Sequence, residues 1–249
     1  MSSSSDLNVW TVLWVGDKPW KYNSRPADRP KQVEDETRLY KPADVVKFQR
    51  MVRAWLPDCK FRCLSNVIVP GVECIPLTLG FEGWWGKVEL WRPDLPAGRN
   101  LYFDLDTLII RDPSPIVRFD APFAAIKPGP GVGSGDQDDP HAPEPWSSWK
   151  DQEGFWRVPR YQTSVMVWDS AYGHKFWHSF MPTHKIRLAS DQDYLGEVFP
   201  DEARMPTNWF RKMPKNGYKP VKPRMVVLTM PMRNDQAARQ HAWVRELWH

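Results

Sequence analysis

Short, continuous runs of apolar residues divide the chain into regular segments. Each run is bounded by Gly, Pro or charged residues, a pattern typical of buried strands. The expected strands cover residues 9–16, 60–66, 72–77, 100–112, 121–127, 164–169 and 224–230.

Between some of these runs, apolar residues recur at helical spacing. One such series lies between two prolines and predicts a helix there. It consists of Val45, Phe48, Val52, Trp55 and Leu56, between Pro42 and Pro57. Further helices are expected up to Trp91, after a Gly/Trp loop at residues 80–87, over residues 171–180, and at the C-terminal end. A strand–helix–strand order implies a mainly parallel sheet flanked by helices, so the expected fold class is α/β.

Two polar stretches predict long loops. Residues 18–39 carry three prolines, and residues 128–160 are dominated by Pro, Gly, Asp and Trp without any period. Loops of this length inside one domain are usually functional or disordered. Basic residues gather later in the chain, over residues 211–224, which at face value is a solvated loop.

Composition narrows the class of protein. The 249 residues are 41% hydrophobic and 26% charged, as in a folded protein, and fit one large domain or two small ones. The net charge of +4 permits an anionic partner without requiring one. Three cysteines without CxxC spacing indicate reduced thiols. No apolar run approaches the roughly 20 residues of a membrane span, and the first residues lack a signal sequence, so we expect a cytoplasmic protein.

Two acids interrupt the apolar run "NLYFDLDTLIIRD" at residues 100–112. In an α/β sheet, ligands bind beyond the carboxyl ends of strands, and Asp104 and Asp106 lie near such an end. Alternation would place both carboxylates on one side of an extended chain, where they could hold Mg²⁺ or Mn²⁺. The cation would offset the cost of burying the pair.

Other interpretations of this D-x-D sequence remain open. Asp106 could begin a turn while Asp104 pairs with an arginine. Phosphatases of the haloacid dehalogenase type use a similar hhhhDxDGT sequence with the first Asp as nucleophile, but here no Gly separates Asp106 from Thr107.

Four motifs in order resemble the GT-A glycosyltransferases, especially family 8 and its small phage and bacterial members. They are "WVGD" after the first strand, the D-x-D strand preceded by "GWWGKVELWRPDL", "YQTSVMVWD", and "SDQDYL". The resemblance covers about residues 9–230. It implies a single GT-A domain over residues 1–249, with a mixed, mainly parallel sheet, and residues 128–160 at the acceptor side. It also implies a retaining, metal-dependent transferase that uses a nucleotide-diphosphate sugar, with a UDP-sugar as the expected donor.

The resemblance also assigns residues to the site. Asp106 would ligate Mn²⁺ or Mg²⁺, and Asp104 would contact the same metal or the ribose. Asp191 and Gln192 would be catalytic, next to the donor sugar. Gln162, Ser164 and Trp156 would contact the donor sugar and the acceptor. The donor and its metal would be bound by Val15, Gly16, Asp17, Lys87, Asp104, Leu105, Asp106 and Arg233. Without the resemblance, Lys87 would be an exposed helix lysine, and Asp191 or Asp193 would cap the following helix.

The sequence departs from the family at one position. The family's third metal ligand is a histidine after the last strand, and here Thr229 stands in its place. Asp235 or Arg233 could substitute for it, the latter by binding phosphate. A protein that binds a donor without transferring the sugar is therefore an alternative, as is a nucleotidyltransferase.

The acceptor is less constrained by sequence than the donor. Tryptophans beside basic residues suit sugar rings and equally suit unstacked bases. They are Trp146, Trp149, Trp156 and Trp209. With the phage-like resemblance, a hydroxymethylpyrimidine in DNA is one candidate acceptor, and a glycan or a small molecule is the alternative.

Overall fold

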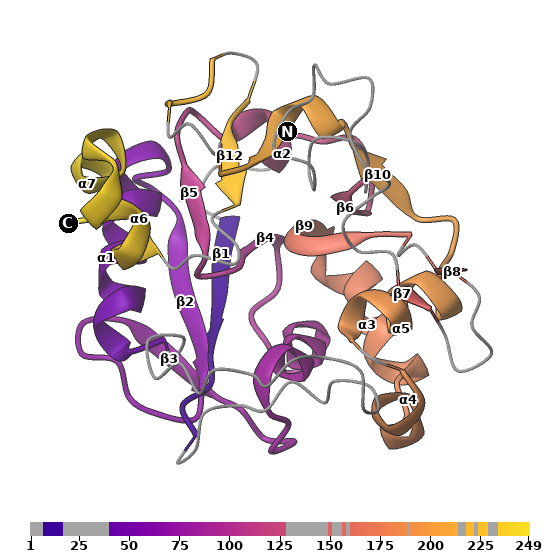
Figure 1. The fold of residues 1–249 in the computed structure, drawn as a ribbon. Helices are drawn as coiled ribbons and strands as arrows, with labels where there is room; N and C mark the ends of the chain where they lie inside the picture. Colours follow the sequence, from indigo (N-terminus) through magenta and orange to yellow (C-terminus); the bar gives the residue numbers. More distant parts are fainter. Residues whose placement is uncertain are drawn as a thin grey trace.

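The computed structural model describes residues 7–16, 40–127, 149–150, 156–157, 160–188, 190–213, 218–221, 224–228 and 234–249. Its centre is a seven-stranded sheet of order β10-β6-β9-β4-β1-β2-β3 (Figure 1). The strands are β1 (Leu7–Leu13), β2 (Lys60–Ser65), β3 (Glu73–Pro76), β4 (Arg99–Phe103), β6 (Phe123–Ile126), β9 (Gln162–Asp169) and β10 (Ala203–Met205). Within this sheet β9 runs antiparallel to both of its neighbours, and the other pairs are parallel. The expected α/β class with a mixed, mainly parallel sheet is confirmed.

Helices lie on both sides of the sheet. Figure 1 shows α1, α6 and α7 on one side, and α3, α4 and α5 on the other. Their bounds are α1 (Pro42–Trp55), η3 (a 3₁₀ helix, Gly83–Trp91), α2 (Ser114–Val117), α3 (Ser170–Ser179), α4 (Pro182–Arg187), α5 (Asp191–Val198), η4 (3₁₀, Thr207–Trp209), α6 (Asn234–Gln240) and α7 (Ala242–Leu247). No described helix is long and apolar enough to cross a membrane.

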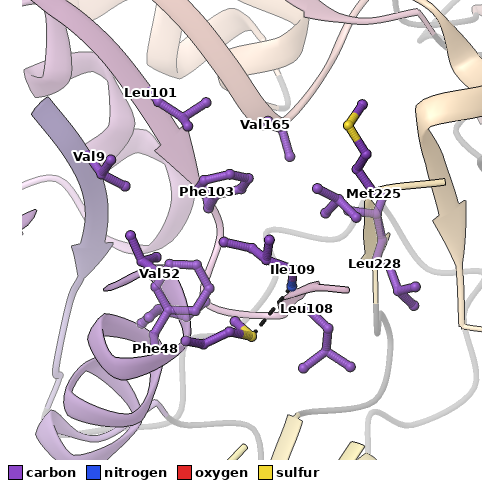
Figure 2. Packing of buried hydrophobic residues seen from close by; sticks show 14 of the residues in the cluster. Val9, Phe48, Val52, Leu101, Phe103, Leu108, Ile109, Val165, Met225 and Leu228 are labelled. Carbon is purple, nitrogen blue, oxygen red and sulfur yellow. Dashed lines mark hydrogen bonds between the residues drawn. The ribbon is translucent and has the colours of Figure 1, made fainter. Parts of the chain in front are cut away.

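Alternation along the strands builds two core layers. Leu101 and Phe103 of β4 point into the layer that contains α1, whereas Tyr102 points into the layer that contains η3, α3 and α5. Figure 2 shows the first layer, where Phe48 of α1 packs against Phe103 at a ring-centroid distance of 6.0 Å. Each fully buried side chain of this size contributes roughly 1.5–3 kcal/mol.

A smaller sheet lies beside the central one, with the order β11-β12-β5. Its strands are β5 (Thr107–Ile109), β11 (Phe210–Lys212) and β12 (Val226–Leu228). The prediction of one continuous strand over residues 100–112 was therefore wrong. The chain leaves the central sheet at Phe103 and enters the smaller sheet at Thr107, with the two acids in between.

Other boundaries also differ from the prediction. The helix before Trp91 already begins at Gly83, inside the predicted loop, and the C-terminal helix is two helices, α6 and α7. Within residues 128–160, two short strands, β7 (Trp149–Lys150) and β8 (Trp156–Arg157), pair with each other. The predicted loop at residues 18–39 lies outside the described residues.

Candidate active site at the carboxyl end of β4

The D-x-D segment is a turn rather than part of an extended strand. The backbone N–H and the hydroxyl of Thr107 both donate to the carbonyl oxygen of Asp104, at 3.1 and 2.7 Å. The two carboxylates thus leave the sheet edge from a closed turn, and the expected strand alternation does not apply to them.

Neighbouring elements hold this turn from two directions. The backbone N–H of Asp104 donates to the carbonyl oxygen of Ser164 in β9 at 2.8 Å. From α6, the side-chain amide of Asn234 donates to the carbonyl oxygens of Leu105 and Thr107, at 2.9 and 3.0 Å. The backbone of the turn is therefore fixed while the acids project from it.

Lys87 brings a positive charge to these acids. Its Nζ atom lies 2.9 Å from Oδ1 and 3.1 Å from Oδ2 of Asp104, and 3.8 Å from Oδ2 of Asp191. Lys87 is only 7% exposed, so it is not the surface lysine that its helical context alone suggests. Its helix η3 is anchored by the buried carboxylate of Glu89, which accepts from the backbone N–H of Thr78 at 2.7 Å.

Asp191 and Gln192 enter the site from the first turn of α5. The helix is capped by Ser190, whose hydroxyl oxygen accepts from the backbone N–H of Asp193, so neither acid is the cap. Thr163 of β9 contacts both residues. Its hydroxyl donates to Asp191 Oδ2 at 2.6 Å, and its backbone N–H donates to Gln192 Oε1 at 3.3 Å.

Tyr102 of β4 contacts both Asp104 and Lys87. The phenol is 1% exposed and donates to Oδ1 of Asp104, and the Lys87 Nζ atom lies 5.5 Å from the centroid of its ring. Burial and then the charge of Asp104 raise the pKa of Tyr102 well above its usual value. The phenol therefore stays protonated and keeps donating its hydrogen bond.

The carboxylates of Asp104, Asp106 and Asp191 all interact with the ammonium of Lys87. Burial, followed by the charge of Asp104, raises the pKa of Asp106 to about 7. Burial also raises the pKa of Asp191, against the opposing effects of Lys87 and Thr163. Burial alone would lower the pKa of Lys87, but Asp104 and Asp191 outweigh it and the pKa is raised. The site thus favours an additional positive charge.

This chemistry fits a hard divalent cation on Asp104 and Asp106. Both offer carboxylate oxygens from one turn, and a bound cation would offset the burial and the charge of Asp104, which together raise the pKa of Asp106. Among the residues that the structure describes, no three His, Cys, Asp or Glu side chains are grouped so as to hold a metal ion. Phosphate oxygens and water would have to supply ligands beyond these two carboxylates.

Comparison with solved structures places this architecture. The galactosyltransferase LgtC, in complex with donor and acceptor sugar analogues, has a TM-score of 0.58 at 13% identity, over 96% of this chain and 94% of that chain. The bifunctional glycosyltransferase WbbM gives 0.52 at 10% identity, over 97% and 51%. A glycosyltransferase involved in glycosylation of the major capsid of PBCV-1 gives 0.50 at 9%, over 96% and 98%.

The chain has the GT-A fold. At these identities the similarity concerns the fold. No protein-family model and no curated protein matches the sequence.

Within the GT-A fold, five of the residues assigned from sequence come together. Lys87 contacts both Asp104 and Asp191, the charge of Asp104 acts on Asp106, and Gln192 is held by Thr163, which also contacts Asp191. They belong to η3, the turn after β4, and α5.

Other assigned residues have local partners instead. The side-chain amide of Gln162 donates to the hydroxyl of Ser164, whose backbone N–H donates back to Gln162 Oε1 at 2.8 Å. Leu105 packs its side chain into the core at 3% exposure. The backbone of Val15 pairs with the side chain of Asn66, and Gly16 lies under the Trp14 ring, where a Cβ would come within 2.0 Å of it.

The remaining assigned residues lie outside the described part of the structure. They are Asp17, Thr229, Arg233 and the side chain of Trp156. Trp209, expected in a loop, belongs to η4 and makes an edge-to-face contact with Phe119 at 5.9 Å.

Sequence reasoning missed three residues of this candidate site: Tyr102, Thr163 and Asn234. A signal for Tyr102 was present, since it stands two residues before Asp104 and its hydroxyl needs a polar partner when buried. Thr163 stood between two residues that were assigned. Nothing in the sequence connects Asn234 with residues more than a hundred positions earlier.

Proposed function

We propose that this protein is a glycosyltransferase that moves a sugar from a nucleotide-diphosphate sugar to a hydroxyl acceptor. The observation that carries this proposal is the buried ion cluster of Lys87, Asp104 and Asp191 at the carboxyl end of β4 in a GT-A fold. Ligands of open α/β sheets bind at such ends. The published structures with this fold include a galactosyltransferase with donor and acceptor sugar analogues.

Asp104 and Asp106 would hold Mn²⁺ or Mg²⁺ next to the diphosphate. The bound cation would neutralise the negative charge that develops on the diphosphate as the sugar departs. Lys87 is placed to add its ammonium to the same task, since its Nζ atom lies 2.9 Å from Asp104 Oδ1. A UDP-sugar is the donor we propose.

Asp191 and Gln192 would contact the donor sugar. The carboxylate oxygens of Asp191 can accept hydrogen bonds from sugar hydroxyls. The Gln192 side chain would lie near the anomeric carbon, where a neutral amide can support positive charge developing on the ring. We propose that transfer retains the anomeric configuration.

For the chain as a whole, we propose one GT-A domain over residues 1–249, acting in the cytoplasm, with residues 128–160 at the acceptor side. The proposed acceptor is a hydroxymethylpyrimidine in DNA. The net charge of +4 and the tryptophans in residues 128–160 support an anionic acceptor with flat rings.

Donor turnover tests the transferase proposal. The purified protein is incubated with a panel of UDP-, GDP-, ADP- and TDP-sugars, with Mn²⁺ or with EDTA, and nucleotide release is measured together with thermal shift. We expect one donor to be hydrolysed slowly in Mn²⁺, and Asp106→Asn to abolish this while Asp120→Asn, on an exposed residue, does not. Binding without release would indicate a donor-binding protein. Formation of a nucleotide sugar from a nucleoside triphosphate and a sugar phosphate would indicate a nucleotidyltransferase.

The acceptor is tested separately. Oligonucleotides with hydroxymethylcytosine or with unmodified cytosine are offered with the identified donor, and the mass of the DNA is measured. Transfer to the modified base alone is the expected result. Transfer to glycans or small molecules, with no DNA binding that weakens as salt increases, would refute the DNA acceptor.

A further inference from the structure

Thr163 contacts both Lys87 and Asp191 in the candidate site. It is 1% exposed and lies at the beginning of β9, between η3, which carries Lys87, and α5, which carries Asp191 and Gln192. Its hydroxyl oxygen lies 3.4 Å from Lys87 Nζ and 2.6 Å from Asp191 Oδ2.

The direction of these hydrogen bonds follows from the groups involved. A lysine ammonium has three donors and no acceptor, so the Thr163 oxygen accepts from Lys87. The single hydroxyl proton is then available for the carboxylate of Asp191. A hydroxyl can bridge an ammonium and a carboxylate in this way, whereas an aliphatic side chain of the same shape cannot.

The backbone of Thr163 acts on the next residue of α5. Its N–H donates to Gln192 Oε1 at 3.3 Å, so a single residue of β9 holds two consecutive side chains of α5. The direct ion pair between Lys87 and Asp191 is long, at 3.8 Å, so the hydroxyl provides the shortest described contact to Asp191.

An irregularity of the sheet turns Thr163 toward this cluster. In the pairing of β6 with β9, Ala125 faces Met166, but the next residue, Ile126, faces Gln162. Strict alternation is lost there, since Tyr161 and Val165, four residues apart, pack in opposite core layers. Such irregularities are common beside active sites, where they re-aim a side chain.

From this geometry we infer that Thr163 is a positioning residue of the proposed transferase. Its hydroxyl fixes the carboxylate of Asp191, and its backbone N–H fixes the amide of Gln192, relative to Lys87 and Asp104. The inference rests on the proposed function, and it extends that function to a residue that acts through Asp191 and Gln192.

The test compares Thr163→Val, which removes the hydroxyl at nearly constant shape, with Thr163→Ser, which retains it. With the donor found in the panel, we expect kcat of Thr163→Val to fall about 10- to 100-fold, as is typical when a group that orients a site residue is lost. Thr163→Ser should recover most of this rate. The affinity for UDP alone, measured by calorimetry, should stay at the wild-type value in both variants, because UDP lacks the transferred sugar that Asp191 and Gln192 would contact.

Crystal structures of the wild type and Thr163→Val provide a second measurement, independent of turnover. We expect the Asp191 carboxylate to take a new rotamer in the variant, whereas the Gln192 amide should keep its rotamer, because valine retains the backbone N–H that donates to it. An unchanged Asp191 rotamer with unchanged kcat would overturn the inference alone, while the wild type remains an active transferase. A fall in kcat that Thr163→Ser shares, or an equal loss of UDP affinity, would also overturn it, since either result indicates general disruption. A wild type that turns over no nucleotide sugar would overturn the proposed function and this inference together.

Discussion

At the scale of single residues, the folded structure disfavours the ionised form of Asp106. Burial and Asp104 raise its pKa to about 7 from the ordinary 3.8. A pKa raised on folding contributes stability that is complete below about pH 4 and is lost as pH rises through about 7. This is opposite to the usual behaviour of a paired aspartate.

Asp106→Asn should therefore stabilise the protein in EDTA, and more so at high pH. We expect a gain of about 1–3 kcal/mol in the free energy of unfolding at pH 8 and a smaller gain at pH 5. Urea denaturation at both values of pH measures it. A gain that is equal at pH 5 and pH 8 would show that the ionisation of Asp106 plays no part.

Lys87 gives the complementary prediction. Lys87→Met leaves Asp104 and Asp191 without the ammonium that both contact, so we expect a loss of about 3 kcal/mol in the free energy of unfolding at pH 8. The loss should shrink at pH 5, because burial raises the pKa of Asp191 and favours its uptake of a proton as the pH falls. The control is Lys60→Met, on an exposed lysine. If both variants unfold alike, the ion cluster makes no net contribution.

At the scale of elements, α6 and the turn after β4 depend on one side chain. Asn234→Ala removes two hydrogen bonds to the carbonyl oxygens of Leu105 and Thr107, which would stay buried. We expect a loss of about 1–3 kcal/mol and weaker donor binding. Urea denaturation and calorimetry measure these effects, with exposed Asn208→Ala as the control. Wild-type donor affinity in Asn234→Ala would mean that the turn keeps its shape unaided.

Strands β2 and β3 carry thiols of unequal accessibility. Cys63 of β2 is fully buried, and burial raises its pKa. Just before β2, burial raises the pKa of Cys59 to about 11. Cys74, opposite Cys63 in the parallel pair, is only partly buried. Brief alkylation of the folded protein, read by mass spectrometry, should modify Cys74 first, because the thiolate is the reactive form. Early modification of Cys63 would indicate that this edge of the sheet opens readily.

The elements were also where the sequence was most informative. The apolar runs of β1, β2, β4 and β9 and the proline-bounded α1 were predictable, because buried strands and amphipathic helices impose their periods directly. The end of β4 was not predictable. The run continues through Leu108 and Ile109 because β5 is buried as well, in a different sheet. An apolar run indicates that residues are buried, but it does not indicate which sheet they belong to.

The site was predictable in part for a related reason. Asp104 stood out as a charged residue within an apolar run, whereas Lys87 and Asp191 were assigned only through the resemblance of the ordered motifs. Thr163 was passed over because the resemblance assigned roles only to Gln162 and Ser164 on either side of it, and the sequence does not reveal the irregular pairing of β9 with β6. Asn234 could not be found, since its contacts depend on tertiary structure.

At the scale of the whole molecule, the two core layers share the same strands. Residues of β1, β4 and β9 point alternately into each layer. Loss of either layer would therefore expose the face of the shared sheet that it covers. We expect one cooperative unfolding transition, with the same midpoint by far-UV circular dichroism and by tryptophan fluorescence. Separated midpoints would show that the layers unfold independently.

The contacts of Asn234 also bear on the order of folding. They join residues 129 and 127 positions apart, and such distant pairs form only after a large loss of chain entropy. The helices and the parallel β1–β2 pair need much shorter loops. A refolding chain should therefore regain its helical signal before it regains the ability to bind the proposed donor. The interval between the two would measure the time that α6 needs to dock on the D-x-D turn.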